Sequence, residues 1–259
     1  MNRLPIVVLL AAALAVAGCV SERVYQGTDK VVPEAKKDPS QAALARVSLG
    51  MKYLQSGSME LAKDNLVRAL EMAPDLAAAS YGLAYYYQQV KEHDRAHHYY
   101  REAIRLEPAN GDVRNAFGAY LCELQEYDEA IAQFEAAVSS LNYTRVAETY
   151  ENMGLCARRW GDNDKAYGYF KKALSHSGLR ARSLLEAARL ELERSDIEAA
   201  DKSLALYHRH YPVSASSAFL AVRLAKILHD PLAMKQYGDI LTNQFPASEE
   251  AKNYVLDQF

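Results

Sequence analysis

The fold is decided by the segment Ala69-Leu70-Glu71-Met72-Ala73-Pro74, which returns 34 residues later as Ala103-Ile104-Arg105-Leu106-Glu107-Pro108. The same spacing of 34 residues separates Pro212 from Pro246. A proline pushes the residue before it out of the helical region, so each of these prolines is expected to end a helix. A fixed period of this length indicates a protein built from stacked copies of one supersecondary unit.

Three further positions recur in register with the prolines. An alanine precedes each proline position by twelve residues, a bulky apolar residue follows that alanine by four, and a small residue precedes it by twelve. The small residue lets the first helix of a unit approach the second closely, and the bulky residue fills the space between them. The alanines are Ala62, Ala96, Ala130, Ala166 and Ala200, the bulky residues Leu66, Tyr100, Phe134, Phe170 and Leu204, and the small residues Gly50, Ala84, Gly118, Gly154 and Ala188.

This pattern resembles the tetratricopeptide repeat, and it predicts an all-α superhelix of about six helix-turn-helix repeats in residues 42–259. The third repeat lacks its proline and is followed by the extra residues Arg145 and Val146; the sixth has Met234 and Gly238 where alanine and an aromatic are expected. We expect a C-terminal capping helix whose Leu256 and Phe259 cover the last exposed face. The predicted repeats are 43–76, 77–110, 111–144, 147–180, 181–214 and the degenerate 215–246, with the cap at 247–259.

The N-terminus predicts the location of the protein. An apolar run from Leu4 to Ala17 is long enough for a secretory signal and too short to span a bilayer. Val16-Ala17-Gly18-Cys19 resembles the bacterial lipobox, which implies a signal peptide at 1–18 and an acylated Cys19, including a palmitate chain. No aspartate follows the cysteine, so we expect outer-membrane anchoring, facing the periplasm, with the polar residues 19–41 as a flexible tether. The alternative is an ordinary cleaved signal with a chance cysteine.

Composition and motifs argue against several function classes. The formal net charge of −3 does not favour a nucleic-acid surface. The chain has no glycine-rich phosphate loop, nucleophile elbow or Cys-x-x-Cys pair, so we expect no enzyme activity, cofactor or small-molecule substrate. His93, His97 and His98 suggest a metal site, but their place in a turn and on an outward helix face favours a solvated surface. The tyrosines suggest a stacking platform, although Tyr87 and Tyr100 hold core positions. An enzyme site hidden among the repeats is the remaining alternative.

Two cysteines remain besides Cys19. Cys122 and Cys156 lie on the expected first helices of neighbouring repeats, which pack side by side in this architecture. In an oxidising periplasm a disulfide between them is feasible. We therefore expect a bridge, with two buried thiols as the alternative.

The inner surface of such a superhelix is expected to bind extended peptides through the second, fifth, ninth and twelfth residues of each first helix. These residues are apolar in the first two repeats and become polar and charged in the third and fourth. A contiguous apolar surface usually marks a partner site. The alternative is that the tether or an extra helix covers it. The predicted protein-binding groove consists of Leu44, Val47, Met51, Leu54, Tyr81 and Tyr85.

Sequence motifs in the third and fourth repeats indicate which family of tetratricopeptide-repeat proteins the chain resembles. Tyr120-Leu121-Cys122, Tyr127-Asp128-Glu129-Ala130 and Tyr150-Glu151-Asn152-Met153-Gly154-Leu155-Cys156 resemble the PilW and PilF family of type IV pilus biogenesis lipoproteins. The turn at Leu124-Gln125-Glu126 departs from the usual repeat because it lacks glycine. The resemblance implies a pilotin that binds the pilus secretin and promotes its outer-membrane localisation and multimerisation. A different helical-repeat lipoprotein scaffold, serving outer-membrane protein assembly or cell-wall enzymes, is the alternative.

Overall fold

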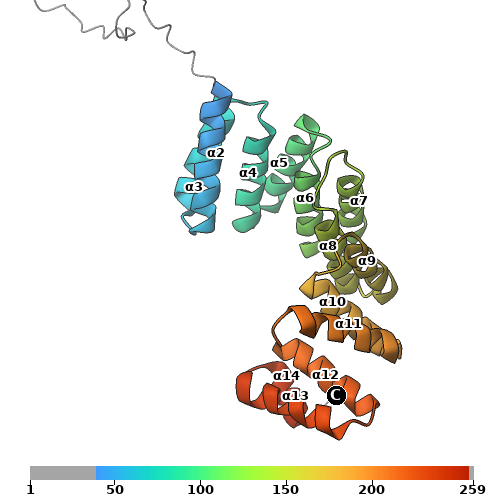
Figure 1. Cartoon of the computed structure of the whole chain (residues 1–259). Helices are drawn as coiled ribbons and strands as arrows, with labels where there is room; N and C mark the ends of the chain where they lie inside the picture. The colour runs from blue at the N-terminus through green and yellow to red at the C-terminus, as the bar shows by residue number, and fades with distance from the viewer. Residues whose placement is uncertain (1–38, 257–259) are drawn as a thin grey trace, which may run out of the picture.

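The computed structural model describes residues 39–256, and every regular element in this range is an α-helix. Six helix-turn-helix pairs follow one another along a curved chain and end in one short helix (Figure 1). The predicted all-α tetratricopeptide-repeat superhelix is confirmed. The pairs are α2 (Pro39–Gln55) with α3 (Met59–Met72), α4 (Ala77–Gln89) with α5 (His93–Leu106), α6 (Gly111–Glu123) with α7 (Tyr127–Val138), α8 (Val146–Trp160) with α9 (Asn163–His176), α10 (Ala181–Glu193) with α11 (Ile197–His210), and α12 (Ala215–Ile227) with α13 (Pro231–Gln244); α14 (Glu249–Val255) is the last helix of the described residues.

The recurring small and bulky residues hold each pair together. A Cβ atom added to Gly118 would lie 2.8 Å from Cδ1 of Phe134, and one added to Gly154 would lie 2.6 Å from Cε1 of Phe170. The first helix therefore rests directly on the side chain of the second helix, as the repeat pattern predicts. All five alanines and all five bulky residues of the pattern are buried.

The turns inside the pairs require a left-handed backbone. Gly57 and Gly161 supply it with φ of +76° and +90°. Gln125 adopts φ of +65° at the equivalent place, so the departure from glycine at this turn leaves the chain reversal in place. Non-glycine residues pay a conformational cost in this region. A glycine in place of Gln125 would therefore adopt the same turn without this cost.

Two boundaries differ from the predicted ones. Helix α2 begins at Pro39, so residues 39–41, assigned to the tether, are helical; the fixed φ of proline suits a first helical turn. Helix α8 begins at Val146, one residue before the predicted repeat. The predicted signal peptide, Cys19 and the rest of the tether lie outside the described residues. Within residues 39–256, no helix combines the length and the apolar character that a membrane span requires.

The C-terminal cap forms with different residues from those predicted. Leu256 is 61 % exposed, so it does not cover the last repeat, and Phe259 lies outside the described residues. Ala251 is buried instead, and the Tyr254 ring occupies the space beside Gly238, where an added Cβ would lie 2.1 Å from the Tyr254 hydroxyl. The cap therefore supplies an aromatic ring where the degenerate repeat lacks one.

Candidate functional site

The candidate site is the inner surface of the superhelix. Figure 1 shows the chain curving so that α4, α6 and α8 lie on the inner side and α5, α7 and α9 on the outer side. First helices of successive repeats also pack against each other, including α2 with α4 and α6 with α8. Side chains that point away from the paired second helices therefore line one continuous surface.

The predicted apolar groove divides into exposed and buried residues. Leu44 is 38 % exposed, and Met51, Tyr81 and Tyr85 are half-buried. We name these four residues the apolar docking surface.

Two residues predicted for the groove belong to the core instead. Val47 and Leu54 are only 9 % and 6 % exposed and join the cluster that includes Leu66 and Leu83. The prediction failed for them because α2 packs against α4, which covers its fifth and twelfth positions.

Tyr81 of the apolar docking surface rests on an aromatic layer beneath it. The ring centroids of Tyr81 and Tyr100 are 6.2 Å apart, and Tyr100 stacks on Phe117 at 4.9 Å. The buried Tyr100 hydroxyl donates a hydrogen bond of 2.7 Å to Oε1 of Gln88. Burial raises the pKa of Tyr81, so its hydroxyl stays neutral. The surface is thus uncharged, and its rings offer apolar contact.

The disulfide lies at the middle of the inner surface. Cys122 on α6 and Cys156 on α8 are joined by the bridge expected from their places in the repeats, with Cα atoms 5.7 Å apart. Both cysteines are buried. The bridge therefore ties the third repeat to the fourth, where the two-residue insertion interrupts the regular spacing.

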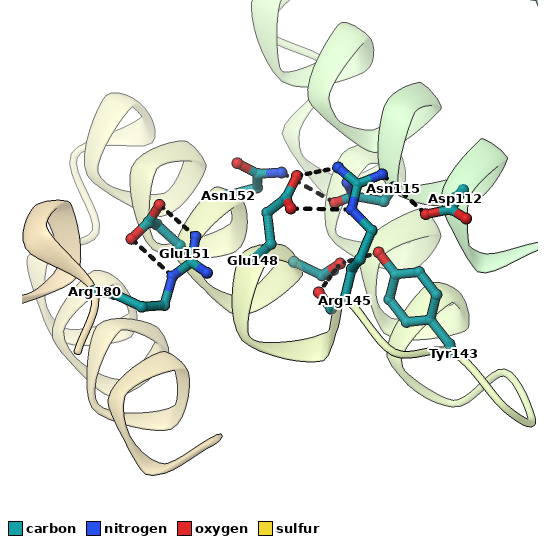
Figure 2. Close-up of polar contacts among 9 residues, drawn as sticks. Asp112, Asn115, Tyr143, Arg145, Glu148, Glu151, Asn152 and Arg180 are labelled. Carbon is teal, nitrogen blue, oxygen red and sulfur yellow. Dashed lines mark hydrogen bonds and ion pairs between the residues drawn. The ribbon is translucent and has the colours of Figure 1, made fainter. Parts of the chain in front are cut away.

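A polar network spans the same junction (Figure 2). Nη1 of Arg145 donates to Oδ1 of Asp112 at 3.0 Å, and its Nε donates to Oε2 of Glu148 at 3.0 Å. Asn152 donates a 3.1 Å hydrogen bond from Nδ2 to Oδ1 of Asn115, which is buried. The inserted Arg145 thus links first helices of two repeats. The sequence analysis did not predict this link. The available signal was that Arg145 lies in the insertion and that acidic residues, Asp112 and Glu148, occupy the second position of the first helix on either side of it.

The network continues to the fifth repeat through a buried carboxylate. Glu151 accepts hydrogen bonds from Nη2 of Arg180 at 2.9 Å and from the Ser183 hydroxyl at 2.6 Å (Figure 2). Burial raises the pKa of Glu151, but these hydrogen bonds and the Arg180 charge outweigh it, so the pKa lies below its usual value. The carboxylate is therefore ionised and paired, which makes it a structural brace between repeats.

One of the three histidines predicted to lie on a solvated surface, His97, is placed differently. His98 is exposed, as a solvated face requires, but His97 is half-buried with its ring 5.6 Å from Phe117. His93 shares a hydrogen bond of 2.8 Å between Nδ1 and the Tyr120 hydroxyl. His97 packs inward because α5 lies against α6 at this point. Among residues 39–256 there is no cluster of three or more His, Cys, Asp or Glu side chains arranged to hold a metal ion.

Comparison with known proteins gives three kinds of match. The tetratricopeptide repeat family matches residues 43–76, 77–110 and 147–175. The type IV pilus assembly protein PilF of Pseudomonas aeruginosa is 31 % identical over 256 residues, covering 99 % of each chain. An uncharacterised protein of Haemophilus influenzae is 42 % identical over 116 residues, which cover 45 % of this chain and 65 % of that protein.

Solved structures agree with the sequence matches. The structure of Pseudomonas aeruginosa PilF has a TM-score of 0.75 at 30 % identity and covers 85 % of this chain and 99 % of that one. The structure of PilW, described as a widely conserved type IV pilus biogenesis factor, has a TM-score of 0.71 at 25 % identity, with 83 % and 99 % covered.

Proposed function

This chain belongs to the family of the type IV pilus assembly protein PilF, and on that premise we propose that it is a pilus biogenesis protein that acts as a pilotin. In this role it binds the pilus secretin and promotes the localisation and multimerisation of the secretin in the outer membrane. The observation that carries the proposal is the match to PilF over nearly the whole of both chains. A scaffold of this kind acts by binding and needs no catalytic group.

The apolar docking surface is the proposed secretin contact. Leu44, Met51, Tyr81 and Tyr85 come from two neighbouring first helices and offer apolar contact on the inner curve. Burying apolar side chains stabilises a complex by about 25 cal/mol per Å² before the costs of association. A client segment with a few apolar side chains therefore gains enough from this surface to be held.

Anchoring is proposed to occur through acyl chains on Cys19. In that arrangement the tether leads from the membrane to α2, so the apolar docking surface is carried by the repeats nearest the anchor. Replacing Cys19 by Ala should release the protein from outer-membrane fractions and reduce the secretin found there. Normal fractionation with intact acyl labelling of another residue would contradict this part of the proposal.

The secretin contact is tested with Met51→Asp. A carboxylate at this half-buried position should prevent co-purification of the secretin from detergent-solubilised outer membranes while the circular dichroism spectrum is retained. The matched control is Leu61→Asp on α3, in the same repeat, because Leu61 is 51 % exposed on the opposite side of the pair. Normal secretin multimers with Met51→Asp, or equal loss with the control, would overturn the proposed contact. Co-purification of a different envelope assembly protein would instead favour another lipoprotein scaffold.

A further inference from the structure

Arginines lie on the first helices of the last three repeats, in the fourth repeat together with the acidic residues Glu148 and Glu151. Four of the five arginines on these helices hold the second, ninth or twelfth repeat position: Arg158 on α8, Arg182 and Arg189 on α10, and Arg223 on α12. Arg189 and Arg223 hold the same repeat position, and Arg182 lies two turns before Arg189 on one face of α10. All four side chains keep solvent exposure, whereas Leu184, Ala187 and Ala188, between the two arginines of α10, are buried. We name these four residues the basic strip.

The charge of the basic strip is only partly neutralised. One carboxylate, that of Glu186, contacts both Arg158 and Arg189, the latter at 3.8 Å from Nε to Oε2. Burial and the neighbouring Arg189 lower the pKa of Arg158, as expected when positive charge is crowded. Within residues 39–256, neither Arg182 nor Arg223 forms an ion pair with a carboxylate, and α12 contains no acidic residue.

Apolar side chains lie along the basic strip. Leu185 on α10 and Phe219 on α12 also hold equivalent repeat positions, and both are half-buried. Leu185 packs on the core cluster that includes Leu192 and Leu204, and Phe219 packs on the cluster that includes Val222 and Leu241. On α10 the order Arg182, Leu185, Arg189 places a leucine between two guanidinium groups on one helix face.

We propose that the basic strip binds an acidic peptide segment of a partner protein, in which an apolar side chain lies between carboxylates. The carboxylates pair with Arg182, Arg189 and Arg223, and the apolar side chain rests on Leu185. Bidentate contact between a guanidinium and a carboxylate supplies both strength and orientation. This site is separate from the apolar docking surface on α2 and α4, and it goes beyond the proposed secretin contact.

The shape and net charge favour a peptide over other anions. The first helices that carry the strip belong to a curved chain (Figure 1), so a flat bilayer would meet the rims of the curve before an inner-surface position. The formal net charge of −3 disfavours long-range attraction of a polyanion such as a nucleic acid. A short acidic segment fits both constraints because it enters the curve and interacts locally.

The test uses the full chain in detergent and a fluorescein-labelled dodecapeptide, Ser-Glu-Leu-Glu repeated three times. Fluorescence anisotropy should show saturable binding that weakens as salt concentration rises. The double variant Arg182→Glu/Arg223→Glu should bind the peptide at least tenfold more weakly. A second double variant, Arg182→Gln/Arg223→Gln, adds no acidic group and should also bind more weakly, so it provides the test if the first variant misfolds. The matched control Arg209→Glu lies on the second helix α11 and should bind within twofold of the wild type.

Three results would overturn the proposal. The first is equal binding of a peptide in which lysine replaces each glutamate, and the second is wild-type affinity in both double variants. The third is sedimentation of the wild-type chain, and not of the variants, with phosphatidylglycerol vesicles in the absence of peptide binding. Met51→Asp should leave peptide binding unchanged, so failure of the secretin contact and failure of this site are distinguishable.

Discussion

Replacing Gly154 by Ala tests the close approach of helices inside a repeat. A Cβ at this position would lie 2.6 Å from Cε1 and 2.7 Å from Cδ1 of Phe170, well inside van der Waals contact. The Phe170 ring is fully buried, so it has to shift its own neighbours to make room. Overpacking of this kind costs about 1–3 kcal/mol of the free energy of unfolding.

Helix propensity acts in the opposite direction. Alanine is favoured over glycine within a helix by about 1 kcal/mol, so the net loss for Gly154→Ala is expected to be about 0–2 kcal/mol. The fifth repeat combines Ala188 with Leu204 at the equivalent positions and packs well. Adding Phe170→Leu should therefore relieve the clash, and the double variant should be about 1–2 kcal/mol more stable than the sum of the single effects.

Urea denaturation of the four proteins measures this coupling. Trp160 is the single tryptophan of the chain and stacks on Tyr127 at 5.5 Å, so its fluorescence reports on the fourth repeat itself. The control is Gly168→Ala on α9, where an added Cβ meets no atom within 4 Å, and it should be neutral or stabilising. Additive single effects, or a Gly154→Ala variant as stable as the control, would refute the close-packing account.

Three other changes probe the turn, the disulfide and the buried carboxylate. Gln125→Gly should stabilise the fold by up to about 1 kcal/mol in thermal unfolding, because the residue has φ of +65°; destabilisation would mean that the side chain contributes more than the backbone strain. Cys122→Ser should lower the free energy of unfolding by about 3–4 kcal/mol under oxidising conditions, and the difference should vanish when the wild type is reduced, since the Cys156 bridge closes a long loop. Glu151→Gln should lose stability at pH 7. Because Arg180 holds the folded pKa of Glu151 below the unfolded value, its stabilisation is present above the unfolded pKa and is lost as pH falls through the folded pKa. The two stability curves should therefore converge in acid; parallel curves from pH 7 to 3 would argue against the paired carboxylate.

The repeat architecture follows from local pattern. Small and bulky residues recur in register, and each pair such as Gly118 and Phe134 meets within a single helix-turn-helix unit. Contacts inside one unit depend on residues close in the chain, so their period is visible before any tertiary arrangement is known. The position of the disulfide could be inferred for the same reason, because it follows from which helices are neighbours.

Exposure on the inner surface depends on packing between units, which the period does not reveal. Val47 and Leu54 share the spacing of exposed groove residues, but the packing of α2 against α4 covers them. Arg145 reaches Asp112 across a repeat boundary, and Tyr254 fills the space beside Gly238 from the cap. A side chain at a repeat position is buried or exposed according to what the neighbouring helix places against it, and that is set by how the units stack in three dimensions.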